Sequence, residues 1–155
     1  RMAQMTLEMA NDLYTVRGLL EGMAASLTCE KITPGTLRRL ESVLKKQEQT
    51  VKQKDVVEYS NSDFAFHAIL YESCGNWLLK ELLENIKGRS QPFIWNMTPV
   101  LEELYQDHRN VVEAFRKKDA PVAEKIMKAH NKRMQDHIRW ELKREKREGP
   151  DSVTD

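Results

Sequence analysis

The chain has 155 residues, and its 25 basic and 24 acidic side chains leave a formal net charge of +1. This balance argues against a nucleic-acid-binding surface built on bulk electrostatics. Glycine and proline are scarce, at 6 and 5 residues, while Leu, Glu, Lys, Met and Ala are plentiful, which is typical of a single all-α domain.

Two further absences bear on location. The sequence contains no apolar run of about 18 residues and no signal peptide, so we expect no association with a membrane. Cys29 and Cys74 lack CxxC spacing and are interpreted as small buried thiols in a reducing compartment. We therefore expect a cytoplasmic protein.

The first helix is predicted from about Leu7 to Glu30, and residues 1–6 are interpreted as a remnant or linker. Its apolar residues recur at helical spacing and are Leu13, Val16, Leu20, Ala24 and Leu27. Arg17 and Glu21 form an i,i+4 pair beside this stripe. A surface ion pair is the simpler interpretation, and the alternative is that Arg17 turns inward and meets an anion.

The second helix begins at Thr33 and Pro34, an N-cap followed by a proline in the first turn, and ends near Gln53. Its charged run, residues 45–49, is interpreted as a solvated face. The third helix is predicted from about Val56 to Ser73.

Three more helices follow. The fourth begins near Leu78 and extends to about Trp95, with an irregularity expected at Gly88 or before Pro92. Thr98 and Pro99 begin the fifth helix, and Asp119 caps the sixth. Beyond Trp140 the sequence is almost entirely charged, so we expect fraying there and a disordered tail over residues 148–155. The pattern predicts an antiparallel bundle of about six helices around a central pocket.

A carboxylate and several imidazoles fall on apolar helix faces. Asp63 and His67 lie four residues apart on the third helix, His108 lies on the fifth, and His130 and His137 both lie on the sixth. Any one histidine is better explained as a hydrogen-bonded core residue. Burying three imidazoles and a carboxylate without a shared partner would cost several kcal/mol. One divalent metal ion removes that cost, although periodicity does not choose between His130 and His137.

Three nitrogens and one oxygen suit Zn²⁺, and also Ni²⁺ or another first-row transition metal. Such a site keeps a charge of about +1, so it attracts a small carboxylic acid, for which an arginine is a bidentate partner. An enzyme is not expected, because no Glu is placed beside the histidines as a general base and no Glu-x-x-His motif is present. A mononuclear metal-dependent hydrolase and a metal-stabilised structural or interaction domain are the alternatives.

Four separated motifs occur in the order of a known family. They are Leu13-Tyr14-Thr15-Val16-Arg17-Gly18-Leu19-Leu20-Glu21, Asp63-x-x-Phe66-His67 followed by Gly75-Asn76, Asp107-His108-x-x-Val111 and Met127-x-x-His130. From about Leu7 to His137, the chain resembles the FadR C-terminal-type (FCD) effector-binding domain of GntR-family bacterial transcription regulators, in its six-helix VanR-like branch.

The resemblance implies a helical domain, over residues 7–147, that senses a small carboxylate through one divalent metal ion. It implies a ligand set of four residues: Asp63, His67, His108 and His130. His137 then has a second-shell or structural role, and Arg17 and Arg89 are expected to contact the effector. The family forms homodimers and binds DNA through an amino-terminal winged helix-turn-helix, which is absent from this chain.

Overall fold

The computed structural model describes residues 6–90 and 96–148, and these segments form six α-helices and one short 3-10 helix without a strand. The helices are α1 (Leu7–Glu30), α2 (Pro34–Gln53), α3 (Val56–Ser73), α4 (Trp77–Ser90), η1 (Thr98–Val100), α5 (Leu101–Arg116) and α6 (Ala120–Glu148). The predicted all-α bundle is confirmed.

Side-chain caps explain where the helices begin. The hydroxyl of Thr6 accepts from the backbone of Met9 at the start of α1, and Thr33 caps α2 in the same way. The carboxylate of Asp55 caps α3. Gly75 follows α3 with a φ of 72°, a conformation that a side chain would strain.

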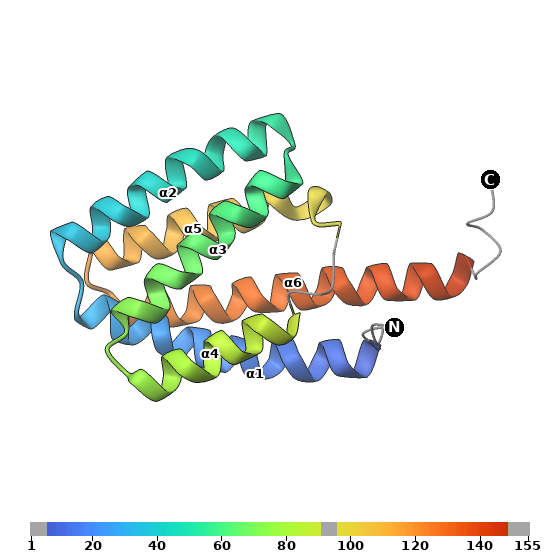
Figure 1. Cartoon of the computed structure of the whole chain (residues 1–155), viewed down its shortest axis with the longest axis horizontal. Helices are drawn as coiled ribbons and strands as arrows, with labels where there is room; N and C mark the ends of the chain where they lie inside the picture. The colour runs from blue at the N-terminus through green and yellow to red at the C-terminus, as the bar shows by residue number, and fades with distance from the viewer. Residues whose placement is uncertain (1–5, 91–95, 149–155) are drawn as a thin grey trace.

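The longest helices, α1 and α6, lie antiparallel along the length of the molecule (Figure 1). In that view α2, α3 and α5 lie on one side of this pair, and α4 lies over α1. Glycines on α1 permit the close approach to α6, because a Cβ at Gly18 would lie 3.3 Å from the Cβ of Asn131. A Cβ at Gly22 would lie 3.0 Å from the side chain of Lys128.

The core consists of two clusters of buried apolar residues, and α3 contributes to both. Phe66 belongs to the larger cluster and Tyr59 to the smaller one. Asp63 lies between them on the same helix. The centre of the bundle is therefore the place where the two clusters meet.

Two details of the predicted elements are wrong. Val16 was placed on the buried stripe of α1, but its side chain is 49% exposed, whereas its neighbour Arg17 is buried. The helix α6 continues to Glu148, so it extends past Trp140, where the charged sequence was expected to fray. Of the tail predicted over residues 148–155, Glu148 belongs to α6, and residues 149–155 lie outside the described residues, as does the helix end expected near Trp95.

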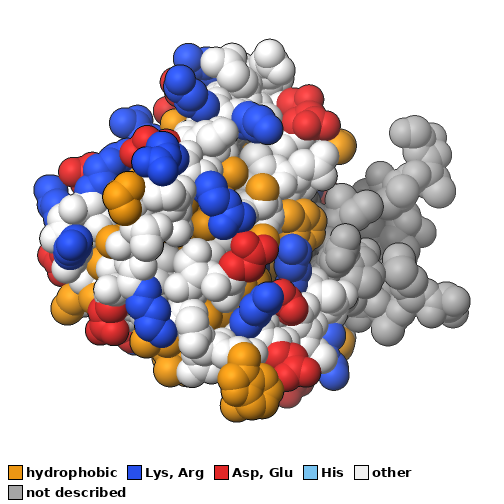
Figure 2. Space-filling view, turned by 60° about the vertical axis from the view of Figure 1, so that its left-hand side comes forward, with side chains coloured by type: hydrophobic (Ala, Val, Ile, Leu, Met, Phe, Trp, Pro, Cys, Tyr) orange, Lys and Arg blue, Asp and Glu red, His pale blue; other side chains and the backbone are white. Residues whose placement is uncertain are grey.

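The surface carries a mixture of charges. Figure 2 shows basic, acidic and apolar side chains interspersed over one face, and no histidine is visible on the described part of that face. None of the described helices is long and apolar enough to span a lipid bilayer.

Candidate metal centre

Three helices bring one carboxylate and three imidazoles together. Asp63 and His67 come from α3, His108 from α5 and His130 from α6. Each offers one ligand atom, and these atoms all lie within 4.8 Å of one another. The three histidines are buried, whereas the side chain of Asp63 is 24% exposed, so the cluster is most open on the Asp63 side.

Each imidazole of the cluster is held by its Nδ1 atom, and each acceptor comes from a different residue. The contacts are Glu21 Oε2 with His67 at 2.5 Å, Gln47 Oε1 with His108 at 2.7 Å, and Asp107 Oδ2 with His130 at 3.0 Å. An acceptor at Nδ1 places a hydrogen there, which leaves the lone pair of a neutral ring on Nε2. The three Nε2 atoms are buried and make no well-aligned hydrogen bond among the described residues; those of His67 and His108 lie 3.2 and 3.5 Å from Oδ1 of Asp63.

The orientation of the Gln47 amide follows from a chain of hydrogen bonds. Ser62 donates its hydroxyl to the carbonyl of Tyr59 at 2.7 Å, so its oxygen accepts from Gln47 Nε2 at 3.2 Å. The amide oxygen of Gln47 must then face His108. The tautomer of His108 is thus set by α2 and α3 rather than by the ring alone.

Glu21 is the most highly connected residue beside the cluster. Besides His67, it accepts from the hydroxyl of Tyr71 at 2.6 Å and from the amide of Asn131 at 2.7 Å, and Arg17 lies 3.5 Å away. Burial alone would raise the pKa of Glu21, but the charges of Arg17 and His67 outweigh it and hold that pKa well below its usual range. The carboxylate is therefore ionised in the interior.

The imidazoles differ in their protonation. Burial lowers the pKa of His67, but Glu21 and Asp63 overcome it and raise this pKa to about 9. Burial and the neighbouring His130 lower the pKa of His108 well below its usual value. In the metal-free protein His67 is therefore protonated and lies between the carboxylates of Glu21 and Asp63, while His108 stays neutral.

The donor set fits a divalent transition metal. Imidazole nitrogen and carboxylate oxygen are ligands that Zn²⁺ and similar ions accept. The N–H of the other ring nitrogen of a metal-bound histidine usually donates a hydrogen bond to a carboxylate or carbonyl oxygen. Here every Nδ1 has such an acceptor, and every Nε2 is buried beside Asp63 without a well-aligned hydrogen bond among the described residues.

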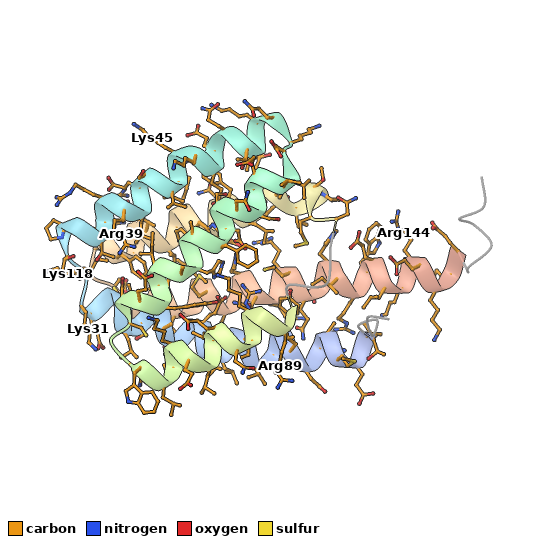
Figure 3. All side chains as sticks on the ribbon, viewed as in Figure 1. Lys31, Arg39, Lys45, Arg89, Lys118 and Arg144 are labelled. Atoms are coloured by element: carbon orange, nitrogen blue, oxygen red, sulfur yellow. The ribbon has the colours of Figure 1, made fainter. Side chains whose placement is uncertain are left out.

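The remaining predicted site residues lie in three different settings. Arg17 is buried, and its guanidinium lies 5.5 Å from the ring centre of Tyr14. Arg89 is exposed on α4 and donates to Asn85, and Figure 3 shows it at the edge of the bundle. His137 Nε2 lies 2.6 Å from the carbonyl of Asn96, apart from the four clustered residues.

Sequence reasoning missed Glu21 and Gln47. The expectation that no Glu lies beside the histidines is wrong, and the surface interpretation of the Arg17–Glu21 pair is wrong as well. Gly18 and Gly22, one turn apart, were the available signal, because they mark the face of α1 that meets α6. Gln47 is fully buried although its run was interpreted as solvated, and its place seven residues after Leu40 was the available signal.

The chain is similar to one known protein family and to a known transcriptional regulator. Residues 12–133 match the family model of the FCD domain. The chain is 30% identical over 137 residues to the HTH-type transcriptional regulator LutR of Bacillus subtilis (strain 168), covering 83% of this chain and 62% of LutR. It therefore spans less than two thirds of the length of that relative.

Two solved structures share the fold. GntR of Streptococcus agalactiae superimposes with a TM-score of 0.69 at 26% identity, over 82% of this chain and 58% of the other. McbR/YncC of E. coli superimposes with a TM-score of 0.78 at 20% identity, over 90% of this chain and 72% of the other.

Proposed function

Because this chain belongs to the FCD domain family, we propose that it is the metal-containing effector-sensing domain of a GntR-family transcription regulator. In this proposal a small organic acid binds the domain and modulates DNA binding by an amino-terminal winged helix-turn-helix outside this chain. The similarity to LutR, whose printed name describes an HTH-type transcriptional regulator, supports the proposed DNA partner.

The observation that carries the proposal is the set of three buried Nε2 atoms that converge beside Asp63 without a well-aligned hydrogen bond among the described residues. Leaving such atoms unpaired is costly, and one divalent ion satisfies all of them. Asp63, His67, His108 and His130 would hold the ion, with Zn²⁺ preferred over Ni²⁺ or another first-row metal. When bound, the ion supplies a positive charge that attracts an anion.

Arg17 supports a carboxylate as that anion. Its guanidinium is buried, yet the nearest carboxylate oxygen, on Glu21, lies as far as 3.5 Å away. A guanidinium carries five N–H donors in a planar fork that matches a carboxylate. Arg17 can thus keep its long contact with Glu21 and still donate to an incoming acid. Exposed Arg89 stays a weaker candidate, because it must leave Asn85 to reach the centre.

A second copy of the chain is the proposed partner for one exposed apolar face. The helices α1 and α4 pack together and expose several large apolar side chains: Val16, Leu19, Met23, Leu78 and Leu82. Exposed apolar residues gathered on neighbouring helices are typical of protein interfaces. A homodimer would let effector binding alter the spacing of two DNA-binding domains, provided that the effector binds the two arrangements with different affinity.

Elemental analysis of the purified chain, with a thermal-shift screen of small carboxylic acids, tests this function. We expect one divalent ion per chain, and a melting temperature that falls on chelation and rises with an acid. His108→Ala and His130→Ala should lose the metal and the acid response together. His137→Ala is the matched control and should keep both, because His137 bonds Asn96 instead.

The alternatives give different results. A purely structural helical domain predicts a melting temperature that chelators leave unchanged. A hydrolase needs a general base on the open side of the cluster, but Glu21 binds the Nδ1 side of His67, away from the convergent Nε2 atoms. Retention of full metal stoichiometry by both His108→Ala and His130→Ala would refute the ligand set.

A further inference from the structure

Tyr59 places a buried hydroxyl near the cluster that the proposed ligand set does not use. The residue lies on α3 one turn before Asp63, and its side chain is 3% exposed. Its hydroxyl oxygen has no hydrogen-bond partner among the described residues. Tyr71, one turn beyond His67 on the same helix, differs because its hydroxyl donates to Glu21 at 2.6 Å.

The surroundings of Tyr59 are apolar apart from the cluster. Its ring packs in the smaller core cluster, which also contains Tyr14, Leu104 and Ile138. Burial and then the charges of Asp63 and Asp107 raise the pKa of Tyr59 well above the usual value, so its hydroxyl keeps its proton and can donate a hydrogen bond.

Arg17 lies on this same side of the bundle. Its guanidinium lies 5.5 Å from the ring centre of Tyr14, which belongs to the same smaller core cluster as Tyr59. Arg17 also lies 3.5 Å from Glu21, the partner of His67, so it borders the metal cluster. Asp63, one turn after Tyr59 on α3, forms the most open part of that cluster.

A buried hydroxyl without a partner is costly, and nearly all such groups in proteins are paired. A ligand that occupies the Asp63 side can supply the partner that the described residues do not. We propose that Tyr59 donates a hydrogen bond to a second oxygen of the effector, so that the effector is a carboxylic acid that also carries a hydroxyl, an oxo group or a second carboxylate. This inference rests on the proposed acid-sensing function and narrows the class of acid.

Four acids with one carbon skeleton test the inference: butanoate, 2-hydroxybutanoate, 3-hydroxybutanoate and succinate. Their affinities are measured by calorimetry for the metal-loaded wild type and for Tyr59→Phe. The wild type should bind at least one oxygenated acid about fivefold to tenfold more tightly than butanoate, as expected for one hydrogen bond. Tyr59→Phe should lose that preference while its affinity for butanoate stays within about twofold.

Stability provides a readout that does not depend on the acid. Without effector, Tyr59→Phe should keep its metal content and melt at an equal or higher temperature, because the deleted hydroxyl has no partner to lose and its unpaired burial is relieved. Tyr71→Phe, the matched control, should melt at a lower temperature because it removes the bond to Glu21. A lower melting temperature of effector-free Tyr59→Phe would show an internal partner and overturn the inference.

The two proposals fail in different ways. If the wild type binds neither these four acids nor any other acid of the thermal-shift screen, the acid-sensing function itself is contradicted. If the wild type binds acids but Tyr59→Phe keeps the same ranking among them, only the role of Tyr59 is overturned.

Discussion

Oε2 of Glu21 lies 2.5 Å from Nδ1 of His67, so a carboxylate on α1 orients a ring that α3 directs at the centre of the bundle. The same oxygen accepts from Tyr71 and faces Arg17. One buried carboxylate thus joins the candidate metal site to the candidate anion site, and its removal should disturb both.

Glu21→Gln should weaken metal binding by about 10- to 100-fold, because an outer carboxylate raises the basicity of the imidazole that it orients. It should also lower the free energy of unfolding by about 3 kcal/mol, since Arg17 is left buried without a counter-charge. Competition with a chromophoric chelator and urea denaturation measure the two effects. Glu124→Gln, which alters a half-exposed pair with Lys128, is the control and should change neither.

Gln47→Leu should lower metal affinity by about tenfold, because His108 loses the acceptor that fixes its tautomer. The buried hydroxyl of Ser62 loses its donor as well, so the free energy of unfolding should fall by about 1–3 kcal/mol. Gln49→Leu alters an exposed residue of the same run and should be neutral. Equal metal affinity for both variants would contradict the assigned role of Gln47.

Asp107→Ala should loosen His130 and reduce metal affinity by about 10- to 100-fold. The half-exposed Arg133 also donates to Asp107, so Arg133→Met should show a smaller loss in the same direction. The absorption spectrum of the Co²⁺-substituted protein reports the change in ligand geometry. Asp136→Ala, whose exposed carboxylate pairs with Lys132, should leave that spectrum unchanged.

The metal-free protein should lose stability between about pH 6.5 and pH 9. The pKa of His67 in the folded protein is raised to about 9 from an ordinary 6.5. The contribution of protonated His67 to the free energy of unfolding is therefore complete below pH 6.5 and is lost as pH rises through 9. The loss should reach up to about 3 kcal/mol at 25 °C, as that shift implies. Urea denaturation at several pH values measures it.

The metal-loaded protein should not show this decline, because a ligand nitrogen carries no proton to lose. The depressed pKa values of Glu21 and Asp63 act at the acid end, where their stabilisation is lost as pH falls. Parallel curves for the metal-free and metal-loaded forms above pH 7 would contradict the assignment of His67 as a ligand.

Sequence patterns predicted most of the helix boundaries, because the caps at Thr33 and Asp119 and the break at Gly75 are local signals. The convergence of His67, His108 and His130 also followed from periodicity together with the family resemblance. The sequence patterns did not predict the buried polar residues of α1. Periodicity assigns apolar residues to the core and charged ones to solvent, whereas Glu21 is buried because four partners from α1, α3 and α6 satisfy it.

Five of the six described α-helices contribute to the candidate centre: α3, α5 and α6 supply the clustered side chains, and α1 and α2 supply Glu21 and Gln47. The centre therefore cannot assemble before these five helices have docked. An ion that requires the finished arrangement stabilises the native state without stabilising a partly structured transition state. Its effect on kinetics should appear as slower unfolding, with little change in the rate at which the chain folds.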